Sequence, residues 1–319
     1  MSNFSDKTEP DIFYKHEHVF TVLILSLTTL VGVPGNALVL WVTGVKMERT
    51  VTTILFGNLA LADIMCCLCL PFSAVQFFYP EWLYGPVLCK MLPFFITLNM
   101  YTSVFTLVAI SVDRWILVVR PVWAQNHRRV RTVWMICLAI WVFSSAMSLP
   151  PAIYRKIDTS KNKTICFTDY PNKYAVTFAH LTFGFLIPLI TISACYISLS
   201  IKAYNIRFLN VGRKSTKVAL GIVVAFFITW APYHIMGVVL LYITNDVVDI
   251  LDLLSQSLAF FNSCINPILY VFIGKDMKKR VRQSVRGLMQ NVFYEDLSTS
   301  RSSYRSKSQS GEGTQLEGL

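Results

Sequence analysis

The sequence predicts an all-α membrane protein, built as a seven-transmembrane helix bundle with a short amphipathic helix on the membrane surface. Of its 319 residues, 54% are hydrophobic and only 15% are charged, whereas about a quarter of the residues in a soluble domain are charged. Most of the hydrophobic residues also lie in long uncharged blocks. A soluble chain of this composition would expose much apolar surface and aggregate, so the composition disfavours soluble enzymes, nucleic-acid binders and disordered scaffolds.

Seven blocks are long enough to cross a membrane, since about 20 apolar residues span the hydrocarbon core as a helix. They are residues 19–45, 51–79, 91–112, 132–154, 174–201, 218–245 and 253–274, and Asp63 is the only charged residue within them. A backbone in lipid must satisfy its own hydrogen bonds, which favours helices. Barrel strands would be about ten residues long, with strict alternation of apolar and polar side chains.

The distribution of charge predicts the orientation. The N-terminal segment and the loops on its side carry eight Lys or Arg and ten Asp or Glu, whereas the other side carries 20 and six. Because cytoplasmic loops are rich in Lys and Arg, we expect an extracellular N-terminus and a cytoplasmic C-terminus. The glycosylation sequons at Asn3 and Asn162 then both lie outside. The net charge of +11 is thus a topology signal that favours anionic lipid, not nucleic acid, as a partner.

The chain is expected to divide into an N-terminal segment (1–18), a seven-helix domain (19–274), an amphipathic helix (275–290) and a disordered tail (291–319). Residues 275–290 combine lysines and arginines with spaced apolar residues, a pattern typical of a helix lying on the bilayer. The tail is rich in Ser, Thr and Gly and low in hydrophobicity. No loop is long enough for a separate soluble domain.

Asp63 is the only acid deep within a span. A charge there costs roughly 2.5–3.5 kcal/mol, so it should face the bundle interior and have a partner. Polar residues at a similar depth in other spans are Asn36, Ser103, Asn262, Ser263 and Asn266. Oxygen ligands around a carboxylate suit a small hard cation, so we expect a sodium or proton site.

Prolines and cysteines mark further features of the spans. Pro232 follows Trp230 by two residues, and Pro267 follows Asn266. A bend beside a bulky ring or a polar group is a natural pivot for a switching element. Cys89 at the start of the third span and Cys166 in a loop both lie on the outer side, where the oxidising compartment favours a disulfide between them. The remaining six cysteines lie in spans and are interpreted as small packing residues.

Together, these features resemble the rhodopsin-like class of G-protein-coupled receptors over residues 19–290. The matching positions, in chain order, are Gly35, Asn36, Leu59–Asp63, Asp113–Trp115, Trp141, Pro188, Tyr196, Phe226, Trp230, Pro232, Asn262 and Asn266–Tyr270. Two residues depart from the family pattern, because Trp115 replaces a tyrosine and Thr229 replaces a cysteine. Taken without the family, Asp113 and Arg114 are an acid and a snorkelling arginine at the membrane interface.

The resemblance implies a role for each of these residues. Arg114 would lie near Asp113 at rest and engage a heterotrimeric G protein, of the inhibitory class, on activation. Tyr196 and Tyr270 would move towards it, and Trp230 would report ligand occupancy to Phe226. The Pro232 and Asn266–Pro267 bends would serve as pivots. The residues implied for a resting-state sodium ion are Asp63, Ser103, Asn262 and Asn266.

Within the class, the resemblance is to chemoattractant receptors of the complement anaphylatoxin group. Phe260 stands where an opsin carries its retinal lysine, and Ile96 stands where an amine receptor carries an aspartate, so both subclasses are disfavoured. Trp82–Gly85 resembles a first-loop motif of chemoattractant peptide receptors, and three segments look like the anaphylatoxin group, namely Leu98–Tyr101, Pro121–Arg128 and Pro232–Ile235. The segment from Gly274 to Val285 is most similar to receptors for complement component 3a.

The resemblance implies a basic extracellular peptide ligand that ends in an arginine with a free carboxylate. Asp252 would bind its guanidinium and Arg155 its carboxylate, because such a tail needs both signs of charge. His180 replaces a family arginine that also contacts the carboxyl end, and Tyr233 lies one turn above Trp230. The short loop at 155–173 leaves component 5a, chemerin, formyl peptides and chemokine-like peptides as alternative ligands, since mammalian component 3a receptors have a very long loop there.

The resemblance also implies receptor kinases and arrestin as partners of the tail. The candidate phosphorylation sites are Ser298, Thr299, Ser300, Ser302, Ser303, Ser306, Ser308, Ser310 and Thr314. An ion transporter is the alternative from another class, in which Asp63 would mark a conduction path. Transporters are built from internal repeats, whereas these seven spans are odd in number and dissimilar. An enzyme is not expected, because the embedded His180 and His234 have no carboxylate partner within their spans.

Overall fold

The computed structural model describes residues 16–79, 81–159, 163–205 and 213–273, with side chains for 18–79, 81–159, 163–202 and 219–268. The helices are α1 (His16–Trp41), η1 (Val42–Lys46), α2 (Val51–Gln76), α3 (Gly85–Val119), α4 (Pro121–His127), α5 (Val130–Ile153), α6 (Lys173–Leu181), η2 (Thr182–Leu186), α7 (Ile187–Asn205), α8 (Arg213–Val239) and α9 (Asp246–Ile273). A short hairpin of β1 (Arg155–Asp158) and β2 (Ile165–Thr168) joins α5 to α6. The expected helix at 275–290 and the tail lie outside the described residues.

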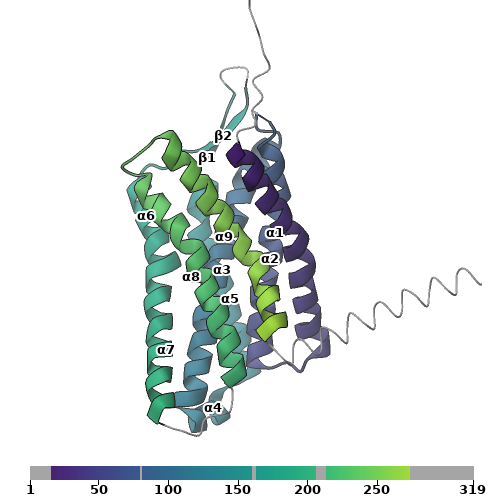
Figure 1. Cartoon of the computed structure of the whole chain (residues 1–319), viewed down its shortest axis with the longest axis vertical. Helices are drawn as coiled ribbons and strands as arrows, with labels where there is room; N and C mark the ends of the chain where they lie inside the picture. The colour runs from purple at the N-terminus through teal and green to yellow at the C-terminus, as the bar shows by residue number, and fades with distance from the viewer. Residues whose placement is uncertain (1–15, 80, 160–162, 206–212, 274–319) are drawn as a thin grey trace, which may run out of the picture.

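The long helices stand side by side, with α3 in the middle of the bundle (Figure 1). The π-helical turn η1 continues α1, and α6, η2 and α7 form one continuous helix. Counted this way, the described part of the chain holds seven helices that are long and apolar enough to cross a membrane. The predicted seven-helix bundle is therefore confirmed.

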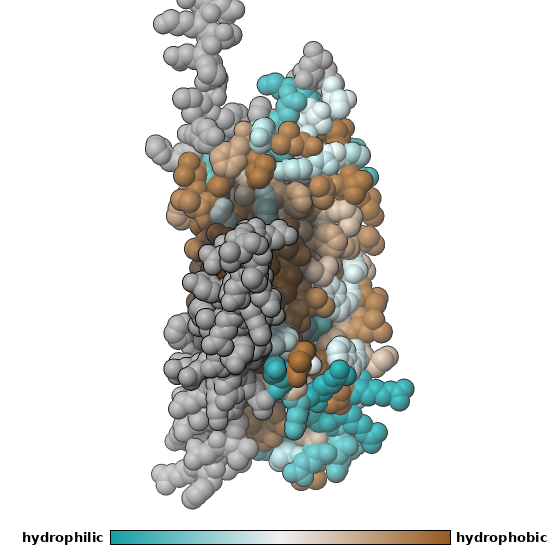
Figure 2. Space-filling view, turned by 90° about the vertical axis from the view of Figure 1, so that its right-hand side faces the viewer, coloured by the Kyte–Doolittle hydropathy of each residue, from teal (hydrophilic) through white to brown (hydrophobic). Residues whose placement is uncertain are grey.

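The bundle is apolar on its outside and holds polar groups inside, as a lipid-embedded protein must. Leu30 on α1 is 73% exposed and Ile190 on α7 is 67% exposed, whereas Asp63 and Asn36 are fully buried. The face drawn in Figure 2 shows hydrophobic side chains over its middle and hydrophilic side chains gathered at its lower end. The outer apolar surface is thus the part that lipid would cover.

Glycine lets two helices approach closely where α1 crosses α9. A Cβ atom placed on Gly35 would lie 2.9 Å from the Cβ atom of Pro267, so a larger side chain there would push the helices apart. Next to it, Asn36 donates a hydrogen bond from Nδ2 to the carbonyl oxygen of Ser263 on α9, at 2.7 Å. The Gly35–Asn36 pair therefore joins α1 to α9 at the level of Asp63.

The two ends of the bundle differ. At the hairpin end, Arg155 of β1 pairs with Thr168 of β2, and a disulfide joins Cys89 on α3 to Cys166 on β2 with Cα atoms 5.9 Å apart. The predicted disulfide is thus confirmed. At the opposite end, which we call the α4 end, the short helix α4 caps the gap between α3 and α5 (Figure 1). The candidate functional groups lie at these two ends and along the axis between them.

Candidate functional sites along the bundle axis

A cavity of about 230 Å³ opens at the hairpin end, between α1, α2, α3, β1 and α9. Arg155 lines it, and its Nη1 donates to the carbonyl oxygen of Cys166 at 3.5 Å. The Arg155 Nε atom is buried and has no hydrogen-bond partner among the described residues. Burial lowers the pKa of the Arg155 guanidinium below its ordinary value, and the nearby Tyr170 opposes that shift. Arg155 is therefore a desolvated cation in the wall of the cavity, and its Nε–H group is available as a hydrogen-bond donor.

Asp252 does not line this cavity but is hydrogen-bonded to a residue that does. Gln256 lines the cavity and donates from Nε2 to the Asp252 carboxylate at 2.6 Å. The two residues stand one helical turn apart on α9, which explains why the pair forms. Of the two predicted charge-reading residues, Arg155 lines the cavity itself, whereas Asp252 is connected to it through the Gln256 amide. Gln256 is a member of this site that the sequence did not single out.

Tyr233 and His180 do not line this cavity and belong to an aromatic layer nearer the middle of the bundle. Tyr233 packs edge-on against Trp230 with ring centroids 5.5 Å apart, and Trp230 stacks on Phe226 at 5.8 Å. Pro232 lies between Trp230 and Tyr233 in the sequence, within α8. The predicted ligand-site residue Tyr233 and the predicted switch residues Trp230 and Phe226 therefore form one continuous aromatic column.

A pair of histidines borders this column. His180 on α6 packs edge-on against Tyr101 of α3 at 5.7 Å, and His234 on α8 contacts Tyr233 at 5.2 Å and Phe185 at 5.2 Å. The Nε2 atoms of both histidines are buried without a hydrogen-bond partner among the described residues. His180 is thus a buried packing residue here and does not face Arg155 across the cavity.

Asp63 accepts two hydrogen bonds in the middle of the bundle. Asn266 of α9 donates from Nδ2 at 2.7 Å, and Asn99 of α3 donates from Nδ2 at 3.1 Å. Asn266 was predicted as a partner, whereas Asn99 was missed because the sequence does not show which face of α3 points at α2. Both amides donate to Asp63, so their own oxygens stay available.

Several buried oxygen atoms near this level have no donor among the described residues. They are the side-chain oxygens of Asn36, Ser103, Asn262 and Asn266. One carboxylate with neutral oxygens around it is a donor set that a hard monovalent cation fits. Clusters of three or more His, Cys, Asp or Glu, which would indicate another kind of metal site, do not occur in the described part of the chain. The predicted sodium ligands thus have the right chemistry, although only Asn266 is hydrogen-bonded to Asp63.

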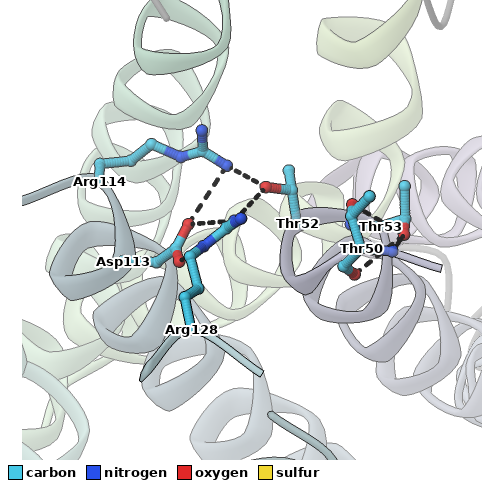
Figure 3. Close-up of polar contacts among 6 residues, drawn as sticks. All are labelled: Thr50, Thr52, Thr53, Asp113, Arg114 and Arg128. Carbon is cyan, nitrogen blue, oxygen red and sulfur yellow. Dashed lines mark hydrogen bonds and ion pairs between the residues drawn. The ribbon is translucent and has the colours of Figure 1, made fainter. Parts of the chain in front are cut away.

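At the α4 end, two arginines share the carboxylate of Asp113 (Figure 3). Arg128 makes a bidentate pair with it, at 2.7 Å from Nε to Oδ1 and 3.1 Å from Nη2 to Oδ2. Arg114 is farther away, at 3.5 Å from Nη2 to Oδ2. Both guanidinium groups also donate to the hydroxyl of Thr52 on α2. The predicted Asp113–Arg114 pair is present, but Arg128 is the stronger partner of Asp113.

Arg128 and Trp115 add contacts that the motif alone does not indicate. Arg128 was noted as a basic loop residue and as the end of the family-like segment Pro121–Arg128, but not as a partner of Asp113, because nothing in the loop sequence shows that it folds back onto α3. Trp115, which replaces the family tyrosine, donates from Nε1 to the Ser198 hydroxyl on α7 at 3.0 Å. Tyr196 on α7 packs against the buried core. Tyr270 lies on α9, beyond the residues whose side chains are described.

Three further groups of predicted sites lie outside the described residues. They are the glycosylation sequons at Asn3 and Asn162 and the serines and threonines of the tail between residues 298 and 314. They stay predictions from the sequence.

Comparison with known proteins places this geometry in a family. Residues 35–270 match the model of the seven-transmembrane receptors of the rhodopsin family. The C3a anaphylatoxin chemotactic receptor of Oncorhynchus mykiss is 43% identical over 307 residues, covering 92% of this chain and 84% of the relative. The receptor of the same name from Danio rerio is 40% identical, covering 91% and 82%. The C5a anaphylatoxin chemotactic receptor 1 of Oryctolagus cuniculus is 39% identical, covering 87% and 83%.

These relatives are receptors and not enzymes, as the sequence led us to expect. The matches also extend over nearly the whole of the described bundle, from α1 to α9. The resemblance drawn from the motifs is therefore confirmed. The chain belongs to the rhodopsin family of seven-transmembrane G-protein-coupled receptors and, within that family, is of the C3a/C5a anaphylatoxin receptor type.

Proposed function

We propose that this chain is a plasma-membrane receptor for a basic anaphylatoxin-type peptide, complement component 3a first, with its hairpin end outside the cell. The observation that carries the proposal is the cavity at the hairpin end, which is lined by Arg155 and by Gln256, the hydrogen-bond partner of Asp252. The names of the relatives at 43% and 40% identity support component 3a, and those at 39% and 38% keep component 5a in the test. The sequence-based charge count supports the orientation.

Recognition follows from the charges of the cavity. A terminal arginine presents a carboxylate and a guanidinium only a side chain's length apart. Arg155 would bind the carboxylate with its unpartnered Nε–H, and the Asp252 carboxylate would bind the guanidinium in place of the Gln256 amide. Both bonds are charge-assisted and lie in a partly desolvated cavity, where such bonds are strong. The N-terminal segment and the outer loops together carry ten acids and eight bases, an excess that would steer a cationic peptide towards the site.

Transmission follows from the position of α9. This helix carries Asp252 near its start and Asn266, which donates to Asp63, three to four turns later. A ligand that binds to Asp252 therefore acts on the same helix that donates a hydrogen bond to the buried Asp63 carboxylate. The adjoining column from Tyr233 through Trp230 to Phe226 runs beside it on α8, so a rotation of one helix repacks the other.

The α4 end is the proposed surface for a heterotrimeric G protein of the inhibitory class. Release of Arg114 from the Asp113 carboxylate would free a guanidinium for the partner, as the family pattern implies. At rest, a sodium ion would bind to Asp63 with oxygens of Ser103, Asn262 and Asn266 and hold the axis in its inactive arrangement. Its charge would balance the buried carboxylate at that level.

Kinase phosphorylation of the tail would recruit arrestin. Several phosphates between residues 298 and 314 would form a dense anionic stretch that suits a basic partner. Replacing all nine serines and threonines by alanine should abolish agonist-induced arrestin binding while leaving G-protein activation intact. Arrestin binding at the wild-type level in that variant would contradict the proposal. Glycosylation of Asn3 and Asn162 should appear as a mass loss on enzymatic deglycosylation.

A cycle between ligand and receptor tests the cavity. Peptides from the C-termini of components 3a and 5a, with and without the terminal arginine, are compared on wild type, Asp252→Asn and Arg155→Gln. Losing a charge-assisted pair costs about 1.5–3 kcal/mol. Potency on wild type should therefore fall roughly 10- to 100-fold when the arginine is removed. On Asp252→Asn the same removal should cost far less, because the partner of the guanidinium is already absent.

Asp249→Asn is the matched control, since Asp249 is an exposed acid on the same helix, one turn nearer the hairpin end. It should keep the full dependence on the terminal arginine. If removal of the arginine changes potency equally on wild type, Asp252→Asn and Asp249→Asn, the assignment of Asp252 is wrong. If neither peptide activates any G protein, the proposal of an anaphylatoxin ligand itself fails.

A further inference from the structure

A second hollow lies on the outside of the bundle, at the α4 end and far from the proposed peptide site. It has a volume of about 400 Å³ and lies between α2, α3 and α5, with α4 closing one end. Most of its lining is aliphatic or aromatic. Representative lining residues are Val51, Leu55, Phe105, Val112, Ile136 and Ile140. We call this hollow the α3–α5 groove, and its size lies within the range of small-molecule sites.

The groove opens towards the surrounding lipid. Ile136 lines it and is 41% exposed, and the neighbouring Trp134, Met135 and Leu138 on α5 are also exposed apolar residues. These side chains point away from the bundle within a span, where hydrocarbon is the solvent. A molecule that fills the groove would therefore enter sideways from the bilayer and would present hydrocarbon to these walls.

Positive charge gathers only at the α4 end of the groove. Arg128 is neutralised there by Asp113, but Arg129 is exposed and its side chain makes no hydrogen bond or ion pair within the described residues. His127 stacks on Trp123 at 4.8 Å, and its Nδ1 lies 3.2 Å from the Trp123 carbonyl oxygen, so Nε2 points elsewhere. The groove thus joins an apolar body to a basic mouth at the depth where a span meets the polar layer.

We propose that the α3–α5 groove binds one acyl chain of an anionic phospholipid, with the lipid phosphate on Arg129 and His127. The charge complementarity favours this occupant over a sterol, since a sterol hydroxyl needs no cation. Basic pockets between spans on the cytoplasmic side bind lipid headgroups in this way. That the lipid lies in the cytoplasmic leaflet rests on the orientation proposed above. The inference does not depend on the identity of the peptide ligand.

Such a lipid would act on the Asp113–Arg128 pair. Asp113 and Arg128 line the groove, so an acyl chain lies against them and keeps water away. Removing water lowers the local dielectric constant and strengthens the ion pair. The lipid would therefore hold α4 and its loop on α3, and would stabilise the arrangement that the structure shows.

The test measures lipid binding, so its failure is distinct from any failure of the receptor to signal. Purified receptor in neutral detergent is titrated with phosphatidylserine, phosphatidylcholine or cholesterol, and bound lipid is counted by native mass spectrometry. Wild type should retain phosphatidylserine preferentially. Arg129→Gln should weaken that binding about fivefold, the effect of one basic residue near an anionic lipid. Arg131→Gln removes an exposed charge two residues further along the chain, in the first turn of α5, that does not line the groove, and should change little.

A second pair of variants tests the groove itself. Ile136→Trp should fill it and remove the preference for phosphatidylserine, whereas Leu138→Trp, at an exposed position outside the lining, should retain it. Thermal melting of each variant shows whether it has folded. If Ile136→Trp does not fold, the comparison of Arg129→Gln with Arg131→Gln still tests the proposal. The proposal would be overturned if Arg129→Gln and Arg131→Gln lost equal amounts of phosphatidylserine binding. It would also be overturned if the two tryptophan variants bound phosphatidylserine equally, or if Ile136→Trp displaced bound cholesterol and not phosphatidylserine.

Discussion

Because Arg114 and Arg128 share the carboxylate of Asp113, we predict that Arg128→Gln and Asp113→Asn change ligand-independent activation of G protein in opposite directions. Arg128 competes with Arg114 for this carboxylate, and the shorter, bidentate contact belongs to Arg128. Replacing Arg128 by glutamine removes the competitor and leaves Arg114 as the only cation on Asp113. Arg114 should then be held more firmly, and ligand-independent activation of G protein should fall. Replacing Asp113 by asparagine releases both arginines and should raise it.

The distances set the size of the effect. At an effective dielectric constant of about 20, the closest N···O distances of 2.7 Å and 3.5 Å correspond to gross attractions of about 6 and about 5 kcal/mol. If Arg114 closes to the distance that Arg128 now occupies, it gains about 1 kcal/mol. The Arg128 side chain is 25% exposed, so screening removes part of this gain. We expect a change of about fivefold in the fraction of receptor with Arg114 released.

Nucleotide exchange on purified G protein, without ligand, measures this fraction. Arg128→Gln should lower the exchange rate about fivefold, Asp113→Asn should raise it, and Arg131→Gln should leave it near the wild-type value as a control for loss of charge at this end. Thermal melting confirms that each variant is folded. If Arg128→Gln raises the exchange rate as Asp113→Asn does, Arg128 restrains the receptor itself and the competition described above does not exist.

Three further predictions concern the axis of the bundle. Replacing potassium by sodium should lower ligand-independent nucleotide exchange in wild type but not in Asp63→Asn, and an equal response of both would refute the sodium site. Gly35→Val should cost about 1–3 kcal/mol by overpacking against the facing proline of α9, and an unchanged melting temperature would show that the helices can separate there. Ser198→Ala removes the acceptor of the Trp115 indole, a bond of about 1 kcal/mol between α3 and α7, and should raise ligand-independent exchange severalfold. Ser200→Ala, whose hydroxyl bonds within its own helix, should not, and equal effects of the two serines would count against the α3–α7 bond.

Composition and motifs predicted the bundle well, because the rules that place a helix in lipid act on the sequence locally. The seven spans follow from hydrophobic blocks alone, and the Cys89–Cys166 disulfide follows from which side of the membrane each cysteine faces. The rest depends on helix rotation and on loops that fold back. Asn99 reaches Asp63 because of how α3 is turned towards α2, and Arg128 reaches Asp113 because the segment after α4 folds back onto α3. A side chain's direction around its helix is weakly encoded where a span is apolar on most faces.

The π-helical turn η2 has a consequence for how this receptor can diverge from its relatives. Within it the Ile187 amide donates to the carbonyl oxygen of Thr182, five residues earlier, so the turn contains one residue more than an α-helical turn. Deleting one residue there would restore a regular helix and rotate α6 by about 100° relative to α7. His180 would leave Tyr101 while Ser198 kept its bond to Trp115. The same span can therefore change the side chains that it presents at the hairpin end without changing those that it presents at the α4 end.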